Sequence, residues 1–108
     1  MTIYLILLAH YIGDFVVQTN WMAMNKSKSL YALSLHIVTY SLCLCLFGWY
    51  FAFINGVAHF FIDLVTSRCS SATYRKGNTK LFWAIIGFDQ MLHTFTLVYT
   101  WKYFLGGN

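Results

Sequence analysis

The stretch from Leu30 to Val65 constrains the fold more than any other part of the chain, because it is apolar almost without interruption. One helix over that stretch would be ~54 Å long, whereas the hydrocarbon core of a bilayer is only ~30 Å thick. We therefore expect one break that divides it into two membrane-spanning helices. The best candidate for the break is Gly48, which leaves two spans of roughly 18 residues. The alternative is the pair Asn55-Gly56.

Composition agrees with a chain that lies in a membrane. Of the 108 residues, 59% are hydrophobic and only 9% are charged, whereas a soluble domain carries roughly 25% charged residues. We predict one all-α domain over residues 1–108, a bundle of four transmembrane helices at about 2–18, 30–47, 50–67 and 81–104. The first span has no basic region before it and no small-residue cleavage site, so we expect a retained helix rather than a removed signal peptide.

Basic residues gather in two stretches, 20–29 and 68–80, and each stretch follows an odd-numbered span. Loops rich in Lys and Arg stay on the cytoplasmic side of a membrane. Both loops are therefore expected to be cytoplasmic, with both termini on the other side. A net charge of +4 also raises the question of nucleic acid. Because no helix carries a basic stripe, we predict no nucleic-acid partner.

The histidines and carboxylates all lie inside the apolar segments, and none of the four histidines or three acidic residues is in a loop. Two segments contain histidine, three residues and then aspartate, and the last segment contains the same pattern reversed. The remaining histidine lies in the second segment. These residues are His10 with Asp14, His59 with Asp63, Asp89 with His93, and His36. Ionisable groups inside a membrane are costly and are functional-site candidates by default.

The order of these residues predicts that they meet at one depth. The two segments that run toward the basic loops have histidine before aspartate, and the segment that runs away has aspartate first. Each aspartate is therefore ~6 Å nearer the basic side than its partner histidine, and His36 falls in the same leaflet. Because these groups would be costly facing lipid, we expect a shared polar pocket that opens toward the cytoplasm. The matching positions of His36 and His93 also suggest a duplicated helical hairpin.

The seven groups match the ligand chemistry of a divalent metal site. Imidazole and carboxylate bind zinc and related metals, and two such residues four apart on a helix can face one ion. Seven groups exceed one tetrahedral shell, so either two ions bind or some aspartates orient a histidine instead. The preferred ligands are His10, His59, Asp63, Asp89 and His93, followed by Asp14 and His36. A proton or ion relay and a purely structural network are the alternatives.

Other polar residues in the spans have simpler interpretations. Gln18, Asn55 and Gln90 are expected to join helices or to orient the ligands. The three cysteines do not make a disulfide framework. Cys43 and Cys45, two residues apart, are expected to pack as small hydrophobic side chains.

Several blocks of sequence together carry a family resemblance. They are Leu8 to Phe15 with Gln18, Trp21 and Lys26, then Leu35-His36, Asn55 to Asp63, and Phe88 to His93. With these blocks the chain resembles the small bacterial and phage membrane proteins grouped as domain of unknown function 3307. The resemblance covers nearly the whole chain and implies a small protein of the bacterial inner (cytoplasmic) membrane with undefined activity. More distantly, the pattern is similar to inner-membrane proteins described as metal-dependent hydrolases.

These observations favour a metal-dependent hydrolase that acts at the cytoplasmic leaflet on a lipid-linked or amphiphilic phosphoester or amide. A divalent ion, zinc or a related metal, would activate a water molecule, and a spare aspartate such as Asp14 would act as general base. The alternatives are a transport subunit for a metal, proton or small solute, and a structural membrane module. Membrane lipids are the expected partners, and four short helices are compatible with a homo-oligomer. The sequence does not name the substrate.

Overall fold

The computed structural model describes residues 2–106, and every regular element among them is helical. Two short turns, π-helical η1 and 3-10 helical η2, interrupt the series of α-helices. In chain order the elements are α1 (Thr2–Tyr11), η1 (Ile12–Val16), α2 (Asn20–Asn25), α3 (Leu30–Leu44), η2 (Cys45–Phe47), α4 (Trp49–Arg75) and α5 (Thr79–Phe104). The all-α prediction is confirmed for this part of the chain.

The predicted break in the long apolar stretch is confirmed at Gly48. Its φ of 116° lies in a region that residues other than glycine rarely adopt. Its N–H donates to the Cys45 carbonyl at 3.0 Å, which closes η2, and α4 begins at Trp49. This glycine therefore reverses the chain and sets α3 beside α4.

The prediction of a basic loop over residues 68–80 was wrong for most of its length. Helix α4 continues through Arg75, and only three residues separate it from α5. No glycine or proline interrupts the sequence between Gly56 and Gly77, and φ is 76° at Gly77. Arg68 supports the extra turns by donating to the Leu64 carbonyl at 3.0 Å. The basic residues of this stretch therefore lie mainly on a helix.

The predicted polar turn over residues 20–29 contains a short helix, α2. The Thr19 hydroxyl accepts a hydrogen bond from the Met22 N–H at 3.1 Å and caps the start of this helix. Met22 is buried and holds α2 against the rest of the bundle. The segment is therefore folded back onto the protein, which brings Lys26 to the edge of the interior.

The first apolar segment ends earlier than residue 18, the limit expected from sequence. Helix α1 stops at Tyr11 and η1 stops at Val16. Gly13 lies in η1 and packs directly on α3, since a Cβ at this position would lie 3.1 Å from Cδ2 and 3.3 Å from Cα of Tyr40. π-Helical turns occur often at functional sites. Here the turn carries Asp14 into the interior.

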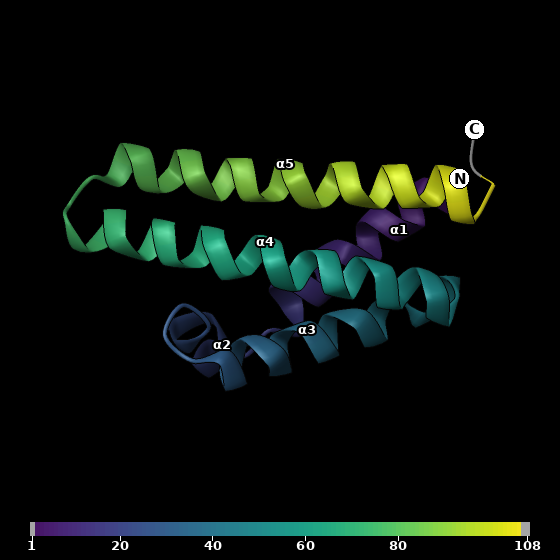
Figure 1. Ribbon diagram of the computed structural model, residues 1–108, viewed down its shortest axis with the longest axis horizontal. Helices are drawn as coiled ribbons and strands as arrows, with labels where there is room; N and C mark the ends of the chain where they lie inside the picture. The colour runs from purple at the N-terminus through teal and green to yellow at the C-terminus, as the bar shows by residue number, and fades with distance from the viewer. Residues whose placement is uncertain (1, 107–108) are drawn as a thin grey trace.

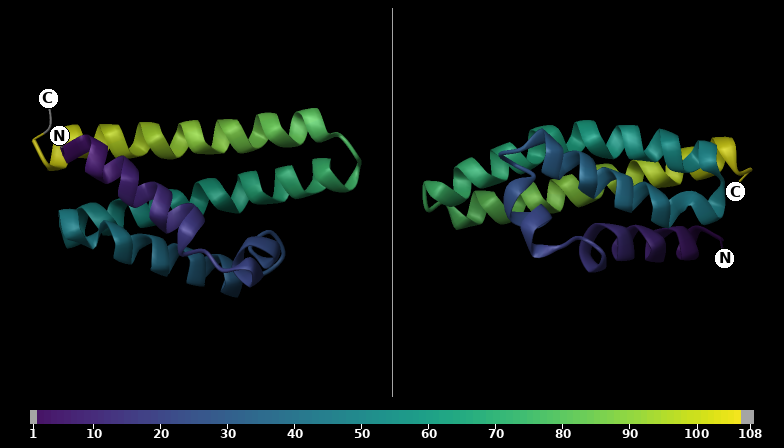
Figure 2. Two further views of the ribbon diagram at one scale, coloured as in Figure 1. Left: turned by 180° about the vertical axis from the view of Figure 1, so that it is seen from behind. Right: turned by 90° about the horizontal axis from the view of Figure 1, so that it is seen from below.

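The helices form one elongated bundle (Figure 1). Helices α4 and α5 make an antiparallel hairpin, α3 packs along the other side of α4, and α1 crosses behind them. Figure 2 shows the same arrangement from two other sides. In all views α2 and the α4–α5 turn lie at one end, and the start of α1 and the end of α5 lie at the other. The two basic segments therefore share one end of the molecule.

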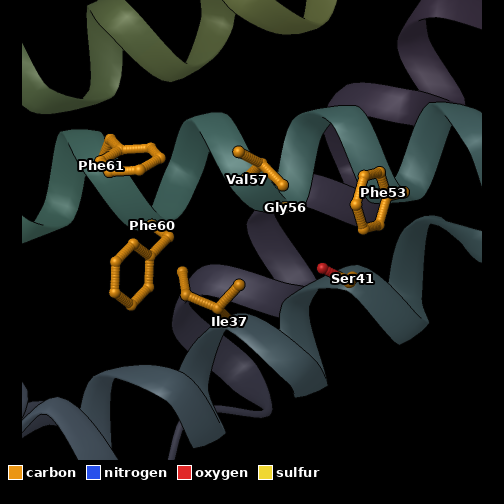
Figure 3. Close-up of a pocket in the computed structure, with 7 residues that line it drawn as sticks. All are labelled: Ile37, Ser41, Phe53, Gly56, Val57, Phe60 and Phe61. Atoms are coloured by element: carbon orange, nitrogen blue, oxygen red, sulfur yellow. The ribbon is translucent and has the colours of Figure 1, made fainter.

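The contact between α3 and α4 leaves an apolar hollow of about 350 Å³ on the outer surface (Figure 3). Gly56 lies in its floor, where an added Cβ would come 2.2 Å from the Ser41 hydroxyl oxygen. Small residues at such contacts let membrane helices approach closely. The remaining lining side chains are all apolar, so this hollow offers packing and no reactive group.

Burial follows the reverse of the pattern seen in soluble proteins. Among the described residues, twelve buried side chains are polar and nine are hydrophobic. Large apolar side chains lie on the outside, for example Leu46 at 89% and Trp49 at 75% exposure. Three helical stretches are long and apolar enough to cross a membrane: Leu30–Phe47, Trp49–Arg75 and Thr79–Phe104. The segment Thr2–Val16 is apolar but shorter. These features indicate a membrane protein.

Candidate metal centre

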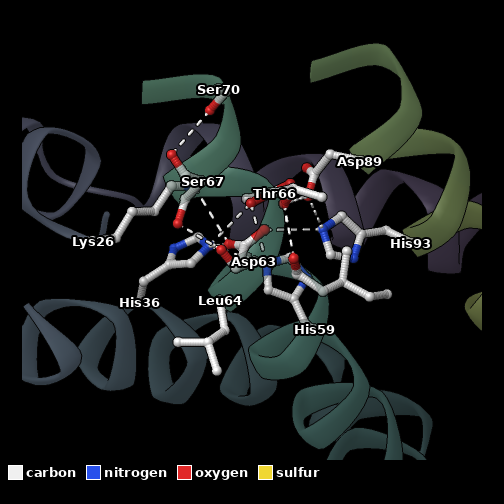
Figure 4. A network of polar contacts seen from close by, with 12 residues as sticks. Lys26, His36, His59, Asp63, Leu64, Thr66, Ser67, Ser70, Asp89 and His93 are labelled. Carbon is white, nitrogen blue, oxygen red and sulfur yellow. Dashed lines mark hydrogen bonds and ion pairs between the residues drawn. The ribbon is translucent and has the colours of Figure 1, made fainter. Parts of the chain in front are cut away.

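The structure brings together all seven histidines and aspartates singled out from the sequence. Each of them is less than one tenth exposed. They come from five elements: His10 from α1, Asp14 from η1, His36 from α3, His59 and Asp63 from α4, and Asp89 and His93 from α5. Figure 4 shows most of them meeting beside α4. The four-residue spacing therefore identified the inward faces of α4 and α5.

Asp14, His36, His59 and Asp63 form the tightest set, which we call the primary group. His36 Nε2 lies 3.1 Å from His59 Nε2, 3.1 Å from Asp14 Oδ1 and 3.3 Å from Asp63 Oδ2. His59 Nε2 lies 3.5 Å from Asp14 Oδ1 and 3.2 Å from Asp63 Oδ2. Four ligand atoms from three elements, η1, α3 and α4, thus converge on one point.

These distances match the edges of a metal coordination tetrahedron. Zinc binds nitrogen and oxygen at about 2.0–2.1 Å, so the ligand atoms of a tetrahedral site lie about 3.3–3.4 Å apart. Five distances between the four atoms of the primary group fall between 3.1 and 3.5 Å. The geometry therefore fits a small divalent ion without rearrangement of the helices.

The histidines of the primary group are free to offer electron pairs to an ion. The Nδ1 atoms of His36 and His59 have no hydrogen-bond partner among the described residues, so Nδ1 is available for the proton of each ring. An imidazole protonated on Nδ1 presents Nε2 as an acceptor. Two such nitrogens and two carboxylate oxygens repel one another at these distances, and a cation between them removes that repulsion.

Asp14, Asp89 and His93 form a second set, which we call the secondary group. His93 Nε2 lies 3.2 Å from Asp89 Oδ1 and 3.2 Å from Asp63 Oδ1. Two carboxylates connect the groups. Asp14 belongs to both sets, and Asp63 turns Oδ2 toward His36 and Oδ1 toward His93. Carboxylates that face two positions in this way are suited to neighbouring cations.

His10 lies beside both groups but belongs to neither. Its Nε2 is 4.0 Å from Asp14 Oδ2 and donates to Gln90 Oε1 at 3.0 Å. The Tyr40 hydroxyl donates to Nδ1 at 2.8 Å. With both nitrogens engaged, His10 has no free electron pair for an ion. The structure thus makes His36 and Asp14 more central than His10, the reverse of the order preferred from sequence.

The π-helical turn explains this reversal. In an α-helix, residues four apart lie on one face, and that spacing pairs His10 with Asp14 in the sequence. The wider turn over Ile12–Val16 shifts Asp14 around the axis relative to His10. Asp14 therefore reaches His36 on α3, while His10 stays at the side. Periodicity alone could not have revealed this, because the turn depends on packing against α3.

Side chains around the groups hold the carboxylates in place. The Gln90 amide donates to Asp14 Oδ2 at 2.9 Å and to Asp89 Oδ2 at 3.2 Å. The Thr66 hydroxyl donates to Asp89 Oδ1 at 2.5 Å. Such contacts orient metal ligands and tune their affinity. Gln90 therefore plays the orienting role expected from sequence, whereas Thr66 was not foreseen.

The other two amide side chains singled out from the sequence, Asn55 and Gln18, differ in whether they form a contact. The Asn55 amide donates to the Thr100 hydroxyl at 2.8 Å, which links α4 to α5 as expected. The Oε1 atom of Gln18 is buried and has no hydrogen-bond partner among the described residues. The expected contact therefore forms for Asn55 and does not form for Gln18 Oε1.

Lys26 is the one charged side chain near the site that sequence reasoning missed. It donates to Asp63 Oδ2 at 3.4 Å, and its side chain is 20% exposed. Nothing in its spacing distinguishes it from Lys28, so the contact depends on how α2 folds back. With neutral imidazoles, three aspartates and Lys26 give the site a formal charge of −2. A negative charge of this kind favours the binding of cations.

Comparison with known proteins supports a family and no activity. No curated protein and no solved structure matches the chain. A family model described as protein of unknown function (DUF3307) matches residues 2–107. Because this match covers almost the entire chain, including every residue of the two groups, the chain belongs to the DUF3307 family.

Proposed function

We propose that the protein binds divalent metal, zinc or a related ion, within a membrane and uses it for hydrolysis. The observation that carries the proposal is the tetrahedral spacing of the primary group, 3.1 to 3.5 Å between ligand atoms. A purely structural network needs one donor for each acceptor. With their rings protonated on Nδ1, His36 and His59 join Asp14 and Asp63 as four acceptors around one point, where Lys26 supplies one donor, and this excess of acceptors favours a cation.

The two groups suit two ions with different roles. Four protein ligands fill the shell of the primary group, as in structural zinc sites. The secondary group offers Asp14, Asp89 and His93, and three protein ligands leave a position open, as in catalytic sites. An ion held there by Asp14, Asp89 and His93 would lower the pKa of a bound water to about 7 and would so supply a nucleophile at neutral pH.

In this arrangement Asp14 is a shared ligand rather than the general base suggested by the sequence. Its Oδ1 faces the primary group, and its Oδ2 accepts from Gln90. Neither oxygen is spare. His93 Nε2 instead lies between two carboxylate oxygens. Asp14 would therefore serve as a ligand shared by the two groups. The neighbouring carboxylates would accept the proton of the water molecule.

The membrane arrangement is part of the same proposal. Residues Thr2–Val16 would be a fourth, short span, and the two halves of the bundle would be a duplicated hairpin in which His36 corresponds to His93. The basic segment after α2 lies at the same end of the molecule as the basic end of α4, and by the positive-inside rule that end would face the cytoplasm of a bacterial inner membrane. Substrates would then be lipid-linked or amphiphilic phosphoesters or amides of the inner leaflet.

Zinc-loaded protein in detergent should hydrolyse p-nitrophenyl phosphate or a p-nitroanilide, and Asp89→Ala should reduce the rate at least about 100-fold while one of two ions is kept. Cys45→Ser is the matched control, because Cys45 is exposed and outside both groups. Measurements are release of nitrophenol or nitroaniline and zinc per chain by elemental analysis. Stoichiometric zinc without turnover of either probe, together with zinc flux in proteoliposomes, would instead support a transport subunit.

A further inference from the structure

A charged hollow of about 520 Å³ lies at the basic end of the molecule, between α2 on one side and α4 with α5 on the other. Lys26 and Lys28 line it from the segment after α2, and Arg75 lines it from the end of α4. No carboxylate lines it, because the three aspartates of the chain all lie in the primary and secondary groups. Three cations and no acid make this hollow attractive to an anion.

Hydroxyl groups stand beside these cations. Ser67, Ser70 and Ser71 line the same hollow along one side of α4. The Ser67 and Ser70 hydroxyls donate to the carbonyl oxygens of Asp63 and Ser67, so Ser71 is the hydroxyl donor that faces a ligand. The Arg75 guanidinium donates to the Ser71 hydroxyl oxygen at 3.0 Å, which holds it toward the serines. Guanidinium, ammonium and hydroxyl donors together are the groups that proteins use to bind phosphate. The positive-inside rule would account for basic residues at this end of the molecule. It would not account for their gathering with hydroxyl groups around one hollow.

The hollow adjoins the primary group, because two of its lining residues, Lys26 and Ser67, lie beside Asp63 (Figure 4). Lys26 lines the hollow and also donates to Asp63 Oδ2 at 3.4 Å. Ser67 lines it too, and its hydroxyl donates to the Asp63 carbonyl oxygen. A ligand held by the cations would therefore sit next to the metal ligands rather than at a separate surface.

Most of the remaining lining is apolar. Met24, Phe82 and Ile86 border the hollow, and Met24 is 72% exposed. A free phosphate ion would gain nothing from these side chains, whereas an acyl or isoprenoid chain would bury apolar surface against them. The combination of cations, hydroxyls and apolar side chains matches a molecule with an anionic head and a hydrophobic tail.

We propose that this hollow binds the phosphate headgroup of a membrane amphiphile and presents it to the metal centre. The inference rests on the proposed function and narrows its substrate class from phosphoester or amide to phosphoester. Arg75 and Lys28 hold the phosphate, Lys26 bridges from the hollow to Asp63, and the apolar side chains take the first part of the tail.

The full-length protein in detergent is mixed with dioctanoyl phosphatidic acid, dioctanoylglycerol or inorganic phosphate, and native mass spectrometry records bound lipid and bound zinc together. Wild-type protein should bind the phosphatidic acid at least about tenfold more tightly than either other probe. Arg75→Gln and Lys28→Gln should each weaken that binding about tenfold with zinc content unchanged. Arg68→Gln is the matched control on the same helix, because Arg68 does not line the hollow, and it should stay within about twofold.

Equal binding by Arg75→Gln and wild type would overturn the assignment of the phosphate site. Equal binding of dioctanoylglycerol would show that the phosphate is not recognised, and equal binding of inorganic phosphate would show that the tail is not. Selective lipid binding by protein that contains no zinc would support the hollow while counting against the proposed function, so the two proposals fail separately.

Discussion

Replacing His36 with alanine should abolish stoichiometric zinc binding in the primary group, whereas the same replacement at His10 should leave it intact. His36 Nε2 lies within 3.3 Å of three other ligand atoms, so its loss removes a corner of the tetrahedron. Loss of one zinc ligand of four reduces affinity by far more than the 10–100-fold typical of residues that only orient ligands. His10 engages Tyr40 and Gln90 instead. Elemental analysis of protein dialysed against a weak chelator measures the difference.

This pair of variants is well matched, because both residues are buried histidines that hydrogen-bond or contact other helices. Circular dichroism and size-exclusion profiles should show that both variants stay helical and monodisperse. If His10→Ala lost zinc while His36→Ala kept it, the sequence-based order of ligands would be right and the geometric one wrong. Zinc retained by both variants would remove the primary group as the site.

Removal of metal from the wild-type protein should lower its unfolding temperature by about 15 °C. A ligand present at about 1,000 times its dissociation constant stabilises the folded state by about 4 kcal/mol. A domain of this size shifts by about 4 °C for each kcal/mol. The shift has a structural reason as well, because without an ion Asp14, Asp63 and the two imidazoles of the primary group are held at repulsive distances. Thermal unfolding in detergent, with and without a strong chelator, measures it.

The control for this prediction is His36→Ala, which keeps only the secondary group intact, so its unfolding temperature should respond much less to zinc or chelator than that of the wild type. Lower stability of that variant in every condition is expected and does not affect the comparison. An unchanged unfolding temperature for chelated wild-type protein would mean that the seven side chains are stabilised by their own hydrogen bonds, as in a structural network.

Local physical rules predicted much of the fold. Gly48 is the only residue near the middle of the long apolar stretch that tolerates a positive φ, so the break could be placed correctly. Length and apolarity identified the three long helices. The extent of α4 could not be predicted from charge, since Arg68 and Arg75 satisfy their side chains on the helix itself. Basic residues indicate where a helix leaves the membrane, not where the helix ends.

The sequence predicted which side chains meet at the candidate site, but it did not predict which of them lie at its centre. The cost of ionisable groups in lipid forces all seven side chains inward, and the spacing and order of the motifs gave their faces and relative depth. Which atoms converge depends on the π-helical turn at Ile12–Val16 and on how α2 folds back. Both depend on contacts between distant segments, such as Gly13 against Tyr40. The central place of Asp14 and the contact of Lys26 therefore became visible only in the structure.

The most direct test of the metal centre is the zinc X-ray absorption spectrum of the purified protein. The account predicts a coordination shell of nitrogen and oxygen at about 2.0–2.1 Å with the scattering pattern of one or two imidazoles for each ion. A shell with sulfur at about 2.3 Å would place the ion on Cys43, Cys45 or Cys69, which lie outside both groups. That result, or a spectrum with no imidazole at all, would contradict the assignment of His36, His59, Asp14 and Asp63 as the primary metal ligands.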